Sequence, residues 1–173
     1  MTAELVYLDS SALVKLVVRE AESEALRAWV TAHPAAVTSA LAVTEVRRAV
    51  SRLSLRRGLS DRARLVLDGL ALLAVDHDVL ERAARLAPAE LRTLDAIHIA
   101  SALSLGADLL AFVTYDDRQR AAARKAGLPL VRPGASEGFA GVADGWKGSE
   151  DLADRVDAVR RTPPRRRARL GRS

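Results

Sequence analysis

Four acidic residues stand at positions from which they could act together, although long segments separate them in the sequence. Asp9 directly follows the apolar run ELVYL, and Asp116 lies near the end of LLAFVTYDD. Glu45 falls in the second turn of an expected helix, and Asp95 falls in the first turn of LDAIHIASALSLGA. A carboxylate among leucine and isoleucine is costly to desolvate unless a cation or a hydrogen bond compensates. The pattern therefore indicates a shared cation.

The segments that carry these acids alternate between strand and helix patterns. Short apolar runs at 4–8, 35–39, 71–76, 109–117 and 128–133 predict strands. Apolar residues at helical spacing predict helices over 10–30, 40–57, 60–70, 77–88, 94–106 and 118–127, with Ser39 and Ser60 as N-caps. Such alternation is typical of βαβ units, which form a parallel sheet covered by helices on both faces.

In such a sheet, ligands bind outside the carboxyl ends of the strands. If the strands at 4–8 and 109–117 are neighbours, Asp9 and Asp116 reach one crevice, and the two acids on helices can join them there. Converging carboxylates cannot all stay ionised without a cation. Oxygen ligands in a chain without cysteine select Mg²⁺ or Mn²⁺. A pair of such ions suits phosphodiester hydrolysis, because it activates water and stabilises the developing charge, so the acids point to a nuclease.

Composition and charge are those of a soluble globular protein. The 173 residues suit one domain, with 49% hydrophobic and 28% charged residues. The chain has no basic leader before an apolar run and no apolar stretch near the roughly 20 residues that span a bilayer, so we expect a cytoplasmic protein that binds no membrane. The net charge of +5 equals the five arginines of residues 163–173, which carry no acid. This end could contact nucleic acid or an acidic partner, but a solvated terminus without fixed structure is the simpler interpretation.

Four segments resemble, in order and spacing, the signature segments of PIN-domain proteins, and specifically of the VapC ribonuclease toxins of prokaryotic type II toxin–antitoxin systems. They are YLDSSALVKL, TSALAVTEVRRAV, LRTLDAIHIASAL and FVTYDDRQRAAARKAGL. The resemblance spans about 4–134. It implies a three-layer α/β/α sandwich with a mostly parallel central sheet of four to five strands. It also implies an Mg²⁺- or Mn²⁺-dependent endoribonuclease that forms a homodimer, is blocked by a cognate antitoxin, and inhibits translation or growth when released.

The resemblance assigns the catalytic and metal-binding roles to four positions. These are Asp9, Glu45, Asp95 and Asp116. It also gives Ser10 and Thr114 the role of small hydroxyl residues, which we expect to hydrogen-bond to a carboxylate or to water at the metal. Asp117 departs from the family pattern, and we interpret it as a surface acid or as an acid that supports the metal ligands from behind, because adjacent strand residues point to opposite faces.

Other polar residues near the acids have less certain roles in the sequence. Arg92 and Arg118 flank the expected site and are candidates for contact with RNA phosphates. His98 lies one turn after Asp95, and we interpret it as a polar residue packed behind the site rather than as a metal ligand. The arginine pairs at 47–48 and 56–57 could follow an RNA backbone, although solvated helix faces are the simpler interpretation.

Alternative functions stay open at this point. Asp9 could merely cap a helix and Asp116 could initiate a turn. A catalytically inactive PIN-like RNA-binding module would keep the fold, but all four acids are present. A phosphohydrolase with an aspartate nucleophile commonly has a second Asp two residues later, where this chain has Ser11. The sequence predicts residues 1–134 as a PIN-like nuclease domain and 135–173 as an extension, helical over about 149–161.

Overall fold

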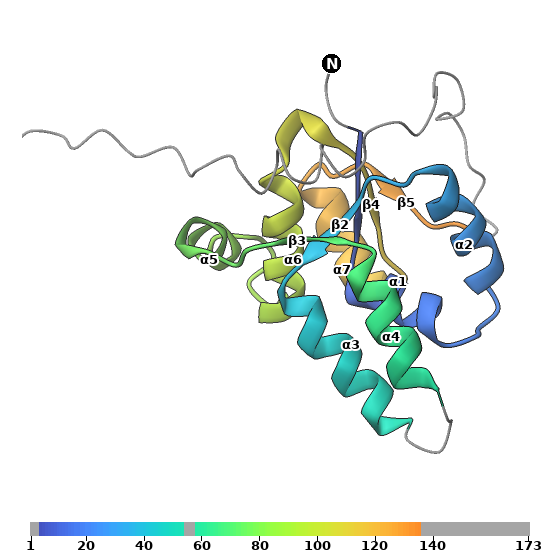
Figure 1. Cartoon of the computed structure of the whole chain (residues 1–173). Coiled ribbons are helices and arrows are strands. Elements are labelled where there is room, and N and C mark those ends of the chain that lie inside the picture. Colours follow the sequence, from blue (N-terminus) through green and yellow to red (C-terminus); the bar gives the residue numbers. More distant parts are fainter. Residues whose placement is uncertain (1–3, 54–57, 136–173) are drawn as a thin grey trace, which may run out of the picture.

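A five-stranded parallel sheet forms the centre of the computed structural model, which describes residues 4–53 and 58–135. The strand order is β3-β2-β1-β4-β5 (Figure 1). The strands are β1 (Leu5–Leu8), β2 (Ala36–Ser39), β3 (Ala71–Leu73), β4 (Leu109–Val113) and β5 (Leu130–Val131). All four strand pairs are parallel, and β1 lies between β2 and β4. The expected parallel sheet and the expected pairing of the first and fourth strands are therefore confirmed.

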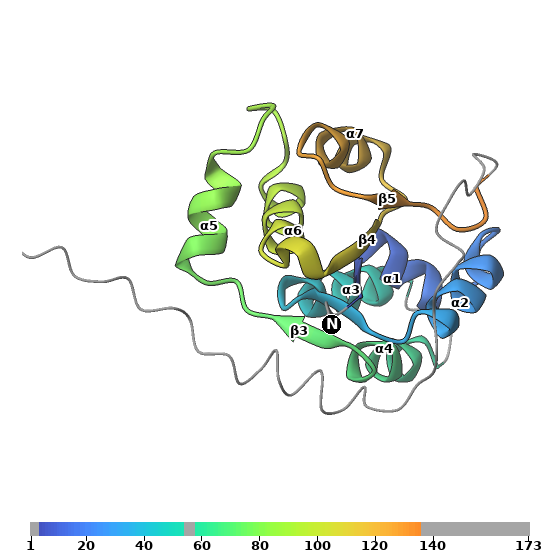
Figure 2. The same cartoon turned by 90° about the horizontal axis from the view of Figure 1, so that it is seen from above.

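Helices cover both faces of this sheet. They are α1 (Ser10–Val17), α2 (Ser23–Ala32), α3 (Leu41–Arg52), α4 (Leu59–Asp68), α5 (His77–Ala84), α6 (Thr93–Leu103) and α7 (Asp117–Lys125), with a short 3₁₀ turn at Gly106–Asp108. One buried cluster joins the sheet to α1, α2, α3 and α4, and another joins it to α6 and α7. Figure 2 shows these two groups of helices on opposite sides of the strands, with α5 lying against α6. The three-layer α/β/α sandwich is confirmed.

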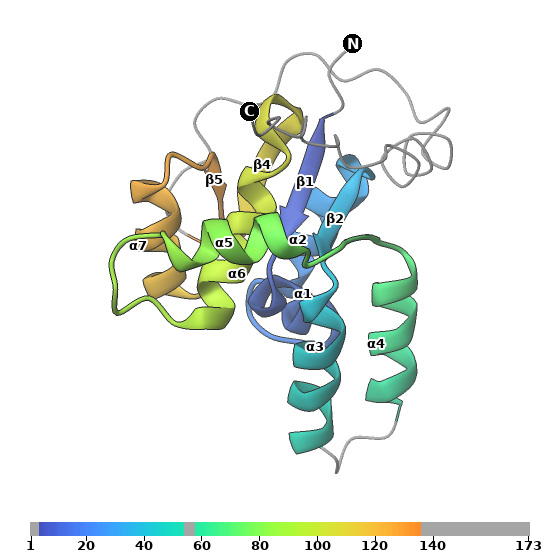
Figure 3. The ribbon, with the colours of Figure 1, turned by 90° about the vertical axis from the view of Figure 1, so that its left-hand side faces the viewer.

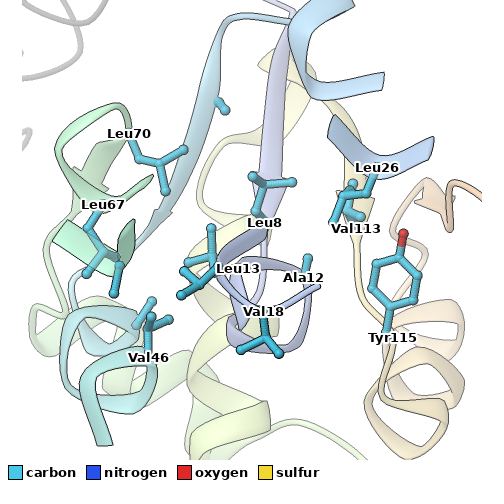
Figure 4. Close-up of a cluster of buried hydrophobic side chains, with 14 of the residues drawn as sticks. Leu8, Ala12, Leu13, Val18, Leu26, Val46, Leu67, Leu70, Val113 and Tyr115 are labelled. Atoms are coloured by element: carbon cyan, nitrogen blue, oxygen red, sulfur yellow. The ribbon is translucent and has the colours of Figure 1, made fainter. Parts of the chain in front are cut away.

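Aliphatic side chains fill the layer between the sheet and α1. Every residue of β1 is buried, as expected for a central parallel strand that is covered on both faces. Leu13 and Val46 are fully buried and belong to the cluster that includes Leu8. Figure 4 shows Leu13 in the middle of this cluster, with Leu8 of the sheet on one side and Val46 of α3 on the other. This packing holds α1 against the sheet at the carboxyl end of β1.

Two paired helices lie beyond the carboxyl ends of the strands. Helices α3 and α4 lie side by side and project beyond the ends of β1 and β2 (Figure 3). Apolar residues at helical spacing, such as Val46, Val50, Ala63 and Leu67, hold the pair together and against α1. Because α3 starts directly after β2, its first turns lie at the edge of the sheet where β1 ends.

Several predicted boundaries are wrong. The single helix predicted over 10–30 is two helices, because the Ser23 hydroxyl donates to the carbonyls of Lys15 and Val18 and so replaces helical hydrogen bonds. The cap predicted at Ser60 is instead Gly58, which has a positive φ of 82°. Ser39 lies one residue before the cap of α3, although its hydroxyl still accepts from the backbone N–H of Leu41.

The fourth strand also ends earlier than predicted, at Val113 rather than at residue 117. The extension predicted over 135–173, including its helix at 149–161 and its arginine-rich end, lies outside the described residues apart from Ala135. Within the described ranges, no helix is both long and apolar enough to cross a membrane.

Replacing Leu13 by alanine tests the packing of α1. Leu13 is fully buried, so Leu13→Ala should lower the free energy of unfolding by about 2–5 kcal/mol. Leu80→Ala, at a side chain that is 45% exposed, should change it by less than about 1 kcal/mol. Urea unfolding followed by circular dichroism measures both values. Equal losses in the two variants would contradict this description of the core.

Candidate functional site

Asp9 is the buried carboxylate at the centre of the site. It follows β1, caps α1 and is only 2% exposed. Its Oδ1 accepts hydrogen bonds from the backbone N–H of Ala12 (2.9 Å) and the Ser11 hydroxyl (2.7 Å). Its Oδ2 accepts from the Thr114 hydroxyl at 2.6 Å. Burial raises the pKa of Asp9, and these hydrogen bonds only partly oppose that effect.

Asp116 lies beside Asp9 through a shared partner, Thr114. Asp116 caps α7, and its Oδ1 accepts from the backbone N–H groups of Arg118 (2.8 Å) and Gln119 (3.0 Å). Its own backbone N–H donates to the Thr114 hydroxyl at 3.1 Å. The Thr114 hydroxyl proton goes to Asp9, which is a carboxylate contact of the kind that the family resemblance implies for Thr114. Thr114 thus links the Asp9 carboxylate to the backbone of Asp116.

The amide of Gln119 completes the hydrogen bonding of Thr114. Gln119 is buried, its Oε1 lies 3.0 Å from the Thr114 hydroxyl, and its Nε2 has no partner. Since the one hydroxyl proton of Thr114 already goes to Asp9, the opposite amide orientation, in which Nε2 donates to Thr114, satisfies both groups.

Glu45 reaches the same edge from α3 and is held by two side chains. Its Oε2 accepts hydrogen bonds from the Ser10 hydroxyl and from His98 Nε2, the latter at 2.7 Å. Burial by itself raises the pKa of Glu45, but the bonds from His98 and Ser10 outweigh it, so the pKa lies below its ordinary value. Ser10 thus makes a carboxylate contact of the kind that the family resemblance implies for it.

His98 is buried behind Glu45 and is oriented by Tyr7. The Tyr7 hydroxyl lies 2.7 Å from His98 Nδ1 and accepts from the backbone N–H of Ser39 at 3.1 Å. Burial raises the pKa of Tyr7, so its hydroxyl keeps its proton and donates it to Nδ1. The other nitrogen, Nε2, then carries the hydrogen that Glu45 accepts. This arrangement leaves neither nitrogen of His98 with a free lone pair for a metal.

Asp95 lies in the first turn of α6 and is the acid with an unsatisfied oxygen. Its Oδ2 is buried and has no hydrogen-bond partner among the described residues. Burial raises the pKa of Asp95, and the negative charge of Asp116 raises it further. Its neighbour Leu94 is 45% exposed, so it does not shield Asp95 from solvent as a core residue would. Asp95 is therefore not enclosed by apolar side chains on every side. Repulsion from Asp116 adds to the effect of burial in destabilising its ionised form.

The remaining predicted site residues separate into two groups. Arg92 and Arg118 line one pocket together with Asp95. Asp117 is exposed and forms an ion pair with Arg132 at 2.6 Å, so it is a surface acid. The physical reason differs from the predicted one, because Asp116 and Asp117 lie at the start of α7 and not in a strand.

Three residues of the site were not singled out for it by the sequence. Ser11 accepts from the backbone N–H of Tyr115 at 2.8 Å while it donates to Asp9, and Tyr7 and Gln119 support His98 and Thr114. Only for Ser11, which stands next to Ser10, did the neighbouring sequence indicate a place in the site. Tyr7 and Gln119 have the pattern of ordinary strand and helix residues, and their roles depend on contacts that the local sequence does not reveal.

The donor set fits a hydrated divalent cation. Within the described residues, no three Asp, Glu, His or Cys side chains are gathered closely enough to form a ready-made metal site. Mg²⁺, however, keeps several water ligands and usually takes only one or two carboxylates directly. The partnerless Oδ2 of Asp95 and the all-oxygen donors match that requirement. Asp9, Glu45, Asp95 and Asp116 are the residues that would hold such an ion.

Comparisons with known proteins agree on one family. The PIN domain family model matches residues 6–125. Ribonuclease VapC46 of Mycobacterium tuberculosis is 53% identical over 131 residues, which is 74% of this chain and 97% of that protein. Ribonuclease VapC47 of the same species is 42% identical over 135 residues, covering 76% of this chain and 98% of that protein. The crystal structure of M. tuberculosis VapC20, a Sarcin-Ricin loop cleaving toxin, has a TM-score of 0.59 at 23% identity, covering 74% of this chain and 99% of that one, and so supports the fold.

Substituting Asp95 by asparagine should stabilise the protein in metal-free buffer. The folded-state pKa of Asp95 lies above its unfolded value of about 3.9, so its ionisation at neutral pH costs stability. The higher Tm of Asp95→Asn should therefore be present at pH 7 and vanish as the pH falls below about 4. Added Mg²⁺ should raise the Tm of the parent protein and not that of the variant.

Scanning calorimetry measures these differences, with Asp61→Asn, at an exposed position of α4, as the control that should show neither effect. A parent Tm that is insensitive to both Mg²⁺ and Mn²⁺ would argue against a metal at Asp95.

Removing the Tyr7 hydroxyl tests the support of His98. Tyr7→Phe leaves the Ser39 N–H and His98 Nδ1 without their partner in the core, so we expect a loss of about 1–3 kcal/mol of unfolding free energy. Tyr115→Phe, which removes a less buried hydroxyl bound to the Pro133 carbonyl, should cost less. Denaturant unfolding gives both values, and a smaller loss for Tyr7→Phe would contradict the proposed chain of hydrogen bonds.

Proposed function

The chain belongs to the PIN-domain family, with VapC ribonucleases among its relatives, and we propose that it is an Mg²⁺- or Mn²⁺-dependent endoribonuclease acting as the toxin of a toxin–antitoxin pair. The observation that carries the proposal is the buried Oδ2 of Asp95, which has no hydrogen-bond partner among the described residues and lies near enough to Asp116 and Asp9 for their charges to raise the pKa of Asp95. A bound divalent ion would polarise water and stabilise the charge that develops on the phosphate and the leaving oxygen.

The residues of the chain then have separate tasks in hydrolysis. Asp95, whose pKa is raised by burial and by the charge of Asp116, is an acid whose ionised form a cation would stabilise. Asp9 is held by Ser11 and Thr114. Water attacks phosphorus in line, the bond from phosphorus to the 3′ oxygen breaks, and that oxygen takes a proton. The products carry 5′-phosphate and 3′-hydroxyl ends.

The carboxylate of Glu45, like that of Asp9, is fixed in orientation by hydrogen bonds from two side chains. Ser10 and His98 both donate to one oxygen, Oε2, which leaves Oε1 available to the site. A carboxylate that is held in place by its neighbours loses little further freedom when it binds a ligand. This favours the enzyme over the inactive RNA-binding module, because binding RNA alone requires no such arrangement of acids.

The partners proposed for the chain follow from the family. Curated relatives at 53% and 42% identity carry the name Ribonuclease VapC, and this supports RNA as the substrate and a cognate antitoxin as the protein that blocks the site. We further propose that release from the antitoxin inhibits translation or growth, that the protein forms a homodimer, and that it acts in the cytoplasm.

The division of the chain into a nuclease domain over 1–134 and an extension over 135–173 remains part of the proposal. Its support is that the family match ends at residue 125 and that VapC46 is matched along 97% of its own length by 74% of this chain.

RNA cleavage by the purified protein tests the proposal. Parent protein with Mg²⁺ or Mn²⁺ should cut total RNA into discrete fragments with 5′-phosphate ends, and EDTA should abolish cleavage. Asp95→Asn and Asp116→Asn should lower the cleavage rate by more than about 100-fold, because substitutions at supporting residues of metal sites alone cost 10–100-fold.

Asp117→Asn is the matched control, because this acid neighbours Asp116 but binds Arg132 at the surface, and it should keep the parent rate. Metal-free cleavage that leaves a 2′,3′-cyclic phosphate would overturn the mechanism. Binding without cleavage in every condition would favour the RNA-binding module.

A further inference from the structure

Tyr115 stands between two members of the candidate site, Thr114 and Asp116, but its side chain lies in the core. It is 9% exposed and belongs to the buried cluster that joins the sheet to α1, α2, α3 and α4. Figure 4 shows its ring on the same side of this cluster as Leu26 of α2 and Val113 of β4. The tasks assigned above for hydrolysis do not involve Tyr115. Its two neighbours share its backbone, however, so whatever holds Tyr115 also helps to hold them.

Two cations lie over the ring of Tyr115. Lys15 Nζ is 4.9 Å from the ring centroid, and Arg132 Cζ is 5.5 Å from it. Both lie within the distance of about 6 Å at which the electron-rich face of an aromatic ring attracts a cation. The two side chains are only 14% and 24% exposed, so water screens this attraction incompletely. The ring is therefore held from α1 and from the chain that follows β5.

Lys15 is itself held in place by two acids. Its ammonium group donates to Glu20 at 2.6 Å and to Glu22 at 2.8 Å. Glu20 lies between α1 and α2, and Glu22 is the N-cap residue of α2. The junction of these two helices thus sets where the ammonium group lies over the ring. The four acids and two hydroxyl residues of the expected site leave Lys15, in the segment YLDSSALVKL, without a role.

The chain that follows β5 contacts both Tyr115 and α2. The Tyr115 hydroxyl donates to the Pro133 carbonyl at 2.6 Å, and an N–H of the Arg132 guanidinium donates to the Tyr115 carbonyl at 3.3 Å. Burial raises the pKa of Tyr115 to about 12, so its hydroxyl keeps the proton that Pro133 accepts. Gly134 approaches α2 so closely that a Cβ atom there would lie 3.0 Å from the Cβ of Ala25.

Arg132 depends mainly on Tyr115 for its position. Its ion pair with Asp117 joins a side chain that is 80% exposed, and such surface pairs contribute little. Its Nε is buried and has no hydrogen-bond partner among the described residues. The ring and the carbonyl of Tyr115 are thus the contacts that favour this buried guanidinium, and loss of the Asp117 charge leaves both intact.

The backbone of Tyr115 joins these contacts to the acids. Its N–H donates to the Ser11 hydroxyl at 2.8 Å, and that hydroxyl donates to Asp9. The next N–H, that of Asp116, donates to the Thr114 hydroxyl, which also donates to Asp9. A displacement of the Tyr115 ring would therefore move the backbone that orients both acids.

We propose that Tyr115 is a positioning residue for the metal-binding acids Asp9 and Asp116, and that Lys15 and Arg132 hold its ring in place. We call these three residues the Tyr115 clamp. The inference rests on the proposed function, since it gives the clamp its purpose at the metal. Without the clamp, a divalent cation would have to order the acids as it binds, and its affinity would fall.

The PIN domain match ends at residue 125, so Arg132 lies beyond it. The clamp thus makes the chain that follows β5 a part of the site.

Two substitutions release the clamp without touching the four acids. Tyr115→Leu keeps an apolar side chain in the core but removes the ring and the hydroxyl. Lys15→Met keeps most of the side-chain length and removes the ammonium group. Leu70→Ala, at a buried position just before the edge strand β3, controls for lost packing far from the clamp. Arg19→Met, at an exposed position near Lys15 in the sequence, controls for lost charge.

Isothermal titration calorimetry of the full chain with Mn²⁺ measures metal affinity without RNA and without catalysis. Tyr115→Leu should weaken Mn²⁺ binding by about tenfold or more, as substitutions of residues that support metal ligands typically do. Tyr115→Phe keeps the ring beneath the cations and should recover most of the affinity. Leu70→Ala should bind Mn²⁺ as the parent does, at a temperature where circular dichroism shows every variant folded.

Lys15→Met separates positioning from simple electrostatics. Loss of a nearby positive charge would by itself strengthen the binding of a cation, whereas loss of the clamp weakens it. We expect weaker Mn²⁺ binding in Lys15→Met and no weakening in Arg19→Met. In NMR spectra of metal-free Lys15→Met, the backbone amide signals of Arg118 and Gln119 should shift, because both groups donate to Asp116 Oδ1. Equal or stronger Mn²⁺ binding in Lys15→Met would overturn its role.

The outcomes separate the clamp from the proposed nuclease. Parent-like Mn²⁺ affinity in Tyr115→Leu would overturn the inference, even if metal-dependent cleavage were confirmed. Equal losses in Tyr115→Leu and Leu70→Ala would also overturn it, because general loss of packing would explain both. If Tyr115→Leu does not fold, Lys15→Met decides in its place.

Two further results bear on both proposals. A parent protein that binds no Mn²⁺ would overturn the clamp together with the metal-dependent mechanism. Weaker Mn²⁺ binding in the clamp variants of a protein that cuts no RNA would support the clamp and refute the nuclease.

Discussion

The hydrogen bond from Thr114 to Asp9 connects the central strand pair to the site. It forms only because β1 and β4 pair in one register, with Leu8 opposite Val113 and the Asp9 N–H donating to the Val113 carbonyl at 3.1 Å. A slip of one residue would turn the side chains of β4 to opposite faces and remove Thr114 from Asp9. The apolar packing of Leu8 and Val113 against α1 and α2 resists such a slip. The aliphatic core is thus what sets the position of the acids.

The acids at this edge are in two different electrostatic situations. Glu45 has a lowered pKa because Ser10 and His98 hydrogen-bond to its charged form. Asp9 and Asp95 have raised pKa values, chiefly through burial, and Asp116 adds repulsion at Asp95. A fold selected for stability alone would place a neutral residue at 95, since a buried carboxylate oxygen without a partner destabilises the apo protein. Such strain concentrates at functional sites, where a ligand relieves it.

The sequence predicted the parallel sheet and the places of Asp9 and Asp116 after neighbouring strands, because both follow from local patterns. Apolar runs such as LVYL identify strands that are covered on both faces, and an acid directly after such a run must lie at the carboxyl edge. The break between α1 and α2 could not be predicted, because Ser23 replaces helical hydrogen bonds only when it reaches the Lys15 carbonyl in three dimensions. The Tyr7–His98–Glu45 chain was missed for the same reason, since its members come from β1, α6 and α3.

Capping and function are not alternatives at Asp9 and Asp116. Each uses Oδ1 to accept backbone N–H groups at the start of a helix, Asp9 at α1 and Asp116 at α7. These bonds fix the rotamer of the carboxylate, so the cap itself supplies the orientation that a ligand-binding acid needs. The cap at Asp116 also sets where α7 begins, and the same helix presents Arg118 and Lys125 to the pocket. One side chain thereby orients an acid of the proposed metal site and sets the start of the helix that lines the neighbouring pocket.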